Sequence, residues 1–239
     1  MRTRAVRLAI QAFAAAAALA SAALAHDAGM AMDMAGYGGQ MAVAGGYHIE
    51  FIVRDGGIRA WVSDARGRPR PAAGTARVLA GGVWREVPLK AGPTMLAGAV
   101  PVKAADAVEC LLSLVVDGRP VAARFAQAAL VTPRLTAPEA AGRQAFQAAC
   151  AQCHGLALRG TDNGPPLLHP MYAPGGDHDD SVILAAMHNG VPRHMWRFGD
   201  MPRPDLPPGS APAVLAYIRA MQAANGLGGP APGPMAHGG

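Results

Sequence analysis

The sequence predicts a multidomain protein in which an antiparallel β-sandwich precedes a domain built of α-helices only. Between residues 47 and 127, short apolar segments alternate with polar residues and are separated by turn residues, without a helical period. Beyond residue 139, apolar residues return at helical spacing instead. A chain of 239 residues allows one large domain or two small ones, and the change of period favours two.

The first 25 residues have the features of a secretory signal peptide. Three arginines precede an uncharged apolar run over residues 8–20, and small residues end at Ala25, the expected cleavage site. We therefore expect an exported, periplasmic protein, with a retained N-terminal anchor as the alternative. No later segment reaches about 18 continuous apolar residues, so we expect no integral membrane segment after signal cleavage.

Composition and charge exclude two classes of protein. Hydrophobic residues make up 51% of the chain and charged residues 15%, which is incompatible with a largely disordered protein. The chain has 21 basic and 16 acidic residues, and three of the basic residues would leave with the signal peptide. The remaining 18 basic residues give a net charge near +2. No basic run is interleaved with aromatic residues, so nucleic acid is not expected as a partner.

Residues 26–46 are rich in Gly, Ala and Met, and we expect them to form a flexible segment. This segment is also a candidate copper site. Met30, Met32 and Met34 carry thioethers, soft ligands of the kind that bind Cu(I). Signal cleavage would leave His26 with a free amino group beside its imidazole, a chelate for Cu(II). The simpler interpretation is that these methionines reflect the low-complexity composition of the segment and bind no metal.

Residues 47–127 are expected to form the Ig-like β-sandwich. Tyr47 to Val53 alternate apolar and polar residues, a Gly-Gly turn follows, and the same pattern then repeats down the segment. About seven strands are expected, over residues 47–54, 58–62, 75–80, 83–89, 95–102, 108–116 and 121–125. Cys110 lies on the apolar face of one strand and is most simply a buried small hydrophobe. This domain contains no recognisable catalytic constellation.

Residues 128–138 contain two prolines and are expected to be a linker. The helical domain follows over residues 139–225, with helices expected at residues 139–151, 181–187 and 211–224. Residues 226–239 form a Gly/Pro-rich tail that we expect to be flexible.

The run Cys150-Ala151-Gln152-Cys153-His154 indicates covalent haem attachment. Two thiols one helical turn apart can add to the two vinyl groups of one haem, while the next histidine binds the iron. Three alternatives are a thioredoxin-like redox pair, a zinc site and a plain disulfide. A redox pair would be expected between a strand and a helix. Zinc would need further Cys or His ligands, and Cys110 lies in the other domain.

The residues around this motif strengthen the haem interpretation. Gly142 and Phe146 lie on the preceding helix, and Tyr217-Ile218 lies on the last one. With these residues, the segment from Glu139 to Gln222 resembles the class I cytochrome c family. The resemblance implies that the first and last helices cross closely at the small residue and the aromatic residues.

The resemblance also implies how the haem would be held. Cys150 and Cys153 would carry it covalently, and His154 would be one axial ligand. The segment Gly164-Pro165-Pro166-Leu167 is similar to the family loop in which a proline carbonyl accepts a hydrogen bond from that histidine, and we favour Pro165 for this role.

The sixth ligand must be selected from several candidates. Met201, followed by Pro202, is similar to the Met-Pro ligand loop of the family and is the preferred choice. Met195 is the main rival, and the sequence also allows a histidine ligand or an open position. Trp196 is expected to form part of the haem pocket wall.

These observations predict one-electron transfer through a single covalent haem c with His/Met ligation, and not an enzyme. The expected partners are redox proteins such as an oxidase or a dehydrogenase. One alternative is a periplasmic copper-binding or redox-sensing protein with an accessory haem domain. Another is a haem enzyme such as a peroxidase, which would need an open sixth position.

Overall fold

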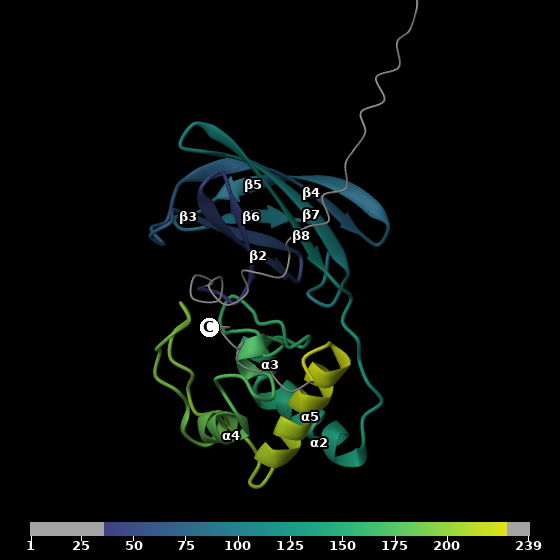
Figure 1. The fold of residues 1–239 in the computed structure, drawn as a ribbon. Coiled ribbons are helices and arrows are strands. Elements are labelled where there is room, and N and C mark those ends of the chain that lie inside the picture. Colours follow the sequence, from purple (N-terminus) through teal and green to yellow (C-terminus); the bar gives the residue numbers. More distant parts are fainter. Residues whose placement is uncertain (1–35, 229–239) are drawn as a thin grey trace, which may run out of the picture.

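The computed structural model describes residues 36–228 of the chain. As predicted, an antiparallel β-domain is followed by a helical domain, and the two lie one above the other in Figure 1. The segment predicted to be a signal peptide and the residues proposed for copper, His26, Met30, Met32 and Met34, lie outside the described residues. Within the described residues no helix is both long enough and apolar enough to cross a membrane.

Eight antiparallel strands make up the first domain. They are β1 (Gln40–Ala44), β2 (Tyr47–Arg54), β3 (Gly57–Ser63), β4 (Ala72–Ala80), β5 (Val83–Ala91), β6 (Leu96–Ala99), β7 (Val108–Val116) and β8 (Arg119–Gln127). Their order is β1-β2-β3-β6-β5-β4-β7-β8. Most of β5 pairs with β4, but its last two residues, Lys90 and Ala91, pair with β6. The strand therefore passes from one layer to the other, which makes the domain sandwich-like.

The core of the β-domain lies between these two layers. Alternate residues of β7, including Cys110 and Leu112, are buried, as the period-2 pattern of that strand requires. The rings of Phe51 on β2 and Phe125 on β8 stack 4.7 Å apart across the core. Burial raises the pKa of the Cys110 thiol to about 12, so Cys110 packs as an unreactive small hydrophobe.

The β-domain begins earlier than the sequence pattern predicts. Strand β1 lies inside the segment 26–46 that was expected to be flexible, and it forms a hairpin with β2. It is only five residues long, and Val43 is its one β-branched residue, yet its backbone pairs along its whole length. The turn is formed by Gly45 and Gly46, whose φ angles of +59° and +83° favour glycine.

The helical domain contains α2 (Ala137–Ala149), α3 (Ala151–His154), the 3-10 turn η1 (Pro170–Tyr172), α4 (Asp180–Asn189) and α5 (Ala211–Ala224). Helix α2 starts two residues before the expected boundary, inside the predicted linker. Thr136 forms a capping box with Glu139, whose carboxylate accepts the Thr136 N–H at 2.7 Å. Pro138 lies in the first turn, where its missing N–H costs nothing.

Helices α2 and α5 cross closely (Figure 1). A Cβ atom on Gly142 would lie 1.9 Å from the carbonyl oxygen of Ala213, so only glycine permits this approach. One turn along, the rings of Phe146 and Tyr217 pack 5.5 Å apart. This crossing holds the helix that precedes the Cys150–His154 motif against the last helix of the domain.

Polar contacts join the two domains. The buried Arg54 of the β-domain donates to the carbonyl oxygen of Arg159 at 2.7 Å. Arg159 in turn donates to the carbonyl oxygen of Ala104 at 2.7 Å. Asp162 lies 3.7 Å from Arg54 Nε and 3.3 Å from Arg59 Nη2. The interface around these residues thus consists largely of guanidinium groups and backbone carbonyls.

Candidate functional site

A cavity of about 430 Å³ lies inside the helical domain. It is bounded by residues of α2, α3, α4 and α5 and by the loop that follows α4. Its walls are mainly apolar and include Phe146, Leu167, Ile183, Met187, Val214 and Ile218. A cavity of this size and character is typical of a cofactor site.

The two cysteines of the motif line this cavity from adjacent turns of the chain. Cys150 ends α2 and begins α3, and Cys153 follows within α3. Neither is bonded to another cysteine. Burial, with a smaller contribution from Cys153, raises the pKa of the Cys150 thiol to about 11. A redox pair of the thioredoxin type needs a thiol with a lowered pKa, so this environment disfavours that alternative.

His154 is buried, and its ring is held in one orientation. Its Nδ1 lies 2.9 Å from the carbonyl oxygen of Pro165, which can only accept, so Nδ1 is the donor. Nε2 is then the ring nitrogen left to bind a metal. Desolvation lowers the pKa of His154, which keeps the imidazole in the neutral form that ligates metals. The structure therefore places the expected proline and histidine together.

Glycines shape the loop that carries Pro165. Gly155 and Gly160 have φ angles of +75° and +74°, and both are needed in that conformation for the chain to turn back after α3. Gly160 donates to the carbonyl oxygen of His154 at 2.8 Å. A Cβ atom on Gly160 would come within 3.0 Å of the Pro165 carbonyl carbon, so a larger residue would displace the acceptor of His154.

Met201 lines the same cavity from the loop after α4. Its backbone N–H and C=O both bond to Val191, each at 2.8 Å. Gly190 turns the chain at this point with a φ angle of +71°, and a Cβ there would lie 2.5 Å from the Met201 oxygen. Met195 also lines the cavity, but 41% of it is exposed. Of the two methionines, Met201 has the more firmly held backbone.

Trp196, which was predicted to line a haem pocket, lies in the wall of this cavity together with Phe198. Its Nε1 donates to the hydroxyl oxygen of Tyr172 at 2.7 Å, and its ring packs edge-on against His169 at 5.2 Å. Neither Tyr172 nor His169 was predicted from the sequence. Both lie in or beside the short turn η1, where no periodic pattern identifies a buried side chain.

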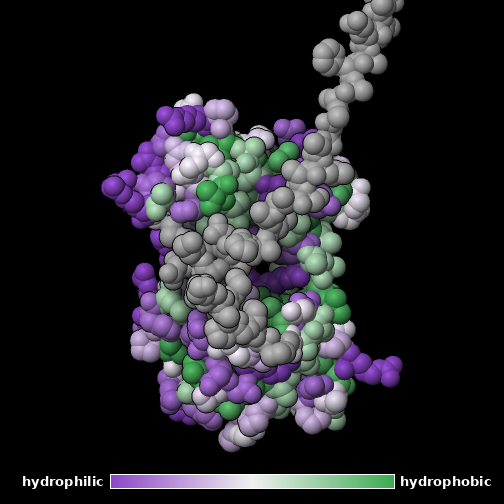
Figure 2. Space-filling model, in the orientation of Figure 1, coloured by the Kyte–Doolittle hydropathy of each residue, from purple (hydrophilic) through white to green (hydrophobic). Residues whose placement is uncertain are grey.

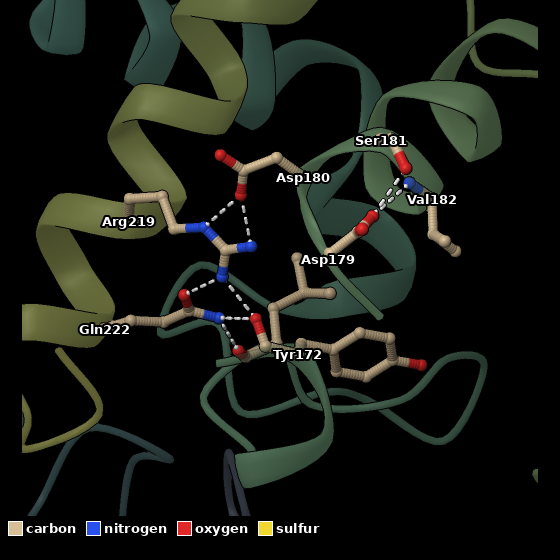
Figure 3. A network of polar contacts seen from close by, with 8 residues as sticks. Tyr172, Asp179, Asp180, Ser181, Val182, Arg219 and Gln222 are labelled. Atoms are coloured by element: carbon tan, nitrogen blue, oxygen red, sulfur yellow. Dashed lines mark hydrogen bonds and ion pairs between the residues drawn. The ribbon is translucent and has the colours of Figure 1, made fainter. Parts of the chain in front are cut away.

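A second group of residues that was missed fixes the loop before α4 (Figure 3). Gln222 on α5 is fully buried, and its amide donates to the carbonyl oxygens of Leu167 and Tyr172, each at 2.9 Å. Arg219 donates to the same Tyr172 oxygen and, through Nε, to Asp180 at 2.7 Å. A polar residue on the apolar face of a predicted helix was the signal that could have identified Gln222.

The acidic residues at the start of α4 act as a helix cap and not as a metal cluster. The Asp179 carboxylate accepts the backbone N–H of Val182 at 3.0 Å (Figure 3). Within residues 36–228 no group of three or more His, Cys, Asp and Glu residues is placed to hold a metal ion.

The residues around the cavity fit an iron porphyrin. They supply two thiols for attachment, a neutral imidazole with its other nitrogen engaged, and a thioether, within apolar walls. The polar part of the wall contains Arg193, His178 and His194, which can face the carboxylates of a haem. Among the residues that the structure describes, no Asp or Glu lines the cavity.

Comparisons with known proteins agree with this geometry. Residues 139–222 match the family model for cytochrome c. No curated protein and no solved structure matches the chain. A cytochrome c domain implies haem binding and a role in electron transfer. The C-terminal helical part of this chain is a cytochrome c domain, preceded by an antiparallel eight-stranded β-domain.

Proposed function

We propose that this protein is an exported electron carrier with one haem c, attached through Cys150 and Cys153 and ligated by His154 and Met201. The observation that carries the proposal is that one apolar cavity contains all four side chains. The haem would supply one-electron iron chemistry. Attachment would form one S–C bond at each cysteine, with the thiol hydrogen transferred to the other carbon of the vinyl group.

Backbone groups of the protein would keep the ligand set constant during electron transfer. The Pro165 carbonyl holds the His154 ring in one tautomer, which makes the imidazole a better donor. Two backbone hydrogen bonds to Val191 hold the segment that carries Met201. Ligands that do not move between oxidation states keep reorganisation small, and the apolar walls exclude water from the site.

A carrier fits these contacts better than a peroxidase does. A peroxidase needs a vacant sixth position, whereas Met201 borders the cavity from a fixed loop. A thioether ligand favours ferrous iron and would raise the reduction potential above that of bis-His ligation.

The proposed partners are redox proteins such as an oxidase or a dehydrogenase. The haem domain, residues 139–225, has six basic residues, all Arg, against seven acidic ones. Hydrophilic and hydrophobic residues are interspersed over the face shown in Figure 2. We therefore expect docking with a modest dependence on salt concentration.

The proposal can be tested by expressing the full chain with a haem-attachment system. The expected product keeps its haem after denaturation and has a low-spin spectrum with the weak Met-to-iron charge-transfer band of the ferric state. Met201→Ala should lose this band, and Met195→Ala should keep it. A high-spin wild-type spectrum, or haem that is released on denaturation, would refute the proposal.

A further inference from the structure

The β-domain contacts the haem domain through a short segment just before β1. We call residues 36–39 the strap. The strap lies between Glu50 and Trp61 of the β-domain on one side and the loops around the haem cavity on the other.

Glu50 fixes the backbone of the strap. Its side chain accepts three N–H groups, from Gly36 at 3.0 Å, Tyr37 at 2.9 Å and Gly39 at 2.8 Å. Glu50 is only 4% exposed. Burial of this kind raises the pKa of Glu50, while the three N–H donors and the charge of Arg197 act in the opposite direction. A carboxylate buried with three donors on one segment is a specific anchor, because each bond to a charged acceptor is strong.

Tyr37 connects the two domains by aromatic contacts. Its ring stacks on Trp61 of β3, with 4.2 Å between the ring centroids. The same ring packs edge-on against Phe198, at 5.7 Å. Phe198 is buried in the wall of the haem cavity, three residues before Met201. Aromatic pairs of this geometry stabilise a contact beyond the burial of the rings alone.

The strap also contacts two loops beside the haem cavity. One carries Met201, and the other carries Pro165, whose carbonyl orients His154. Arg197 donates its backbone N–H to the Gly36 oxygen at 2.8 Å, which ties the strap to the loop of Met201. Gly38 has a φ angle of +73°, and a Cβ on it would lie 2.4 Å from Pro166 Cδ and 3.3 Å from the Trp196 ring. Pro166 directly follows Pro165, whose carbonyl orients His154.

We propose that the strap holds the loops on both sides of the haem, so that Glu50 and Tyr37 are positioning residues for the axial ligands. This inference rests on the proposed function, and it gives the β-domain a role that the cytochrome c domain alone does not supply. Loosening the strap should free residues 196–198, which precede Met201 in the same loop, and let the Met201 side chain leave the iron while its backbone stays paired with Val191. The protein would remain folded with its haem attached.

The test uses the full-length holoprotein and compares Glu50→Ala and Tyr37→Ala with wild type. Both variants should show a weaker Met-to-iron charge-transfer band and a lower reduction potential. The affinity of the ferric iron for imidazole should rise about tenfold, because an exogenous ligand needs the state in which Met201 has left. Glu109→Ala, an exposed carboxylate on β7, is the matched control and should match wild type in all three measurements.

Conservative variants separate positioning from a general loss of structure. Glu50→Gln keeps the oxygen that accepts from Tyr37 and Gly39 but loses the acceptor for Gly36, so its effect should be intermediate. Tyr37→Phe keeps the ring contacts and should restore wild-type values. This graded order supports the inference.

The two proposals fail in different ways. If the wild type lacks a charge-transfer band that depends on Met201, the proposed function is wrong. If that band is present and Glu50→Ala and Tyr37→Ala both keep the wild-type band, potential and imidazole affinity, the strap does not position the ligands. If one alanine variant fails to fold, the other is compared with Glu50→Gln and Tyr37→Phe. The inference is then overturned if these three variants do not differ from one another in band intensity, potential and imidazole affinity.

Discussion

Replacing Gly142 with alanine is the sharpest test of the helix crossing that supports the haem site. The added Cβ would lie 1.9 Å from the Ala213 oxygen and 2.4 Å from its carbonyl carbon. Both atoms belong to the backbone of α5, so no side-chain rotation can relieve the contact. Helices α2 and α5 would have to separate by roughly 1 Å or more to restore an ordinary contact distance.

The magnitude follows from two opposing effects. Overpacking of a close-packed interface costs about 1 to 3 kcal/mol, and the upper end applies because the opposing atoms are backbone. Alanine returns about 1 kcal/mol through its higher helix propensity. We therefore expect the free energy of unfolding of the haem domain to fall by about 2 kcal/mol, which moves the urea midpoint down by about 1 M.

Urea denaturation of the holoprotein, followed by the haem absorption band, reports on this domain alone. Gln147→Ala is the control, because it places an alanine at an exposed position of the same helix. If Gly142→Ala is as stable as Gln147→Ala, the close crossing of α2 and α5 does not exist in solution.

Two further predictions concern buried polar groups. Desolvation lowers the pKa of His169 to about 4 from an ordinary value near 6.5. As the pH falls, the unfolded chain therefore binds a proton at His169 before the folded protein does. The contribution of His169 to the free energy of unfolding is complete above pH 6.5 and decreases between pH 6.5 and 4, by up to about 3 kcal/mol. His169→Gln should flatten this part of the pH profile of unfolding, whereas the exposed His188→Gln should not, and equal slopes would contradict the reasoning. Gln222→Leu leaves the Leu167 carbonyl without its buried donor, while the Tyr172 carbonyl keeps the bond from Arg219, and should cost about 1 to 3 kcal/mol in chemical denaturation. Gln147→Leu, on the exposed side of α2, is its control, and a similar loss in both would show that Gln222 is not a structural donor.

The cytochrome c domain was predictable from sequence because its signals are local. The spacing of Cys150, Cys153 and His154 depends on one helical turn, and the family model covers the segment in which they lie. The strand pattern of the β-domain was predictable for the same reason, since burial alternates along β7 as its sequence does. The assignment of Met201, and the exported location, stay predictions.

Other features were not predictable because they depend on contacts between distant segments. Glu50 occupies what looks like an ordinary polar position on a strand, but the strap covers it. Strand β1 is too short and has too few β-branched residues to be recognised, and it is held by its pairing with β2. The network of Gln222 with Tyr172 joins residues fifty positions apart, which no local pattern encodes.

The arginine contacts between the domains have a calorimetric consequence. Arg54 and Arg159 each donate to a backbone carbonyl of the other domain, so separation at this point rehydrates polar groups. Exposure of polar surface lowers the heat capacity, whereas exposure of apolar surface raises it. Opening of these polar contacts alone would therefore lower the heat capacity, whereas separation at the strap, where Tyr37 packs on Phe198, would raise it. The sign of a heat-capacity change that precedes melting would show which part of the interface opens first.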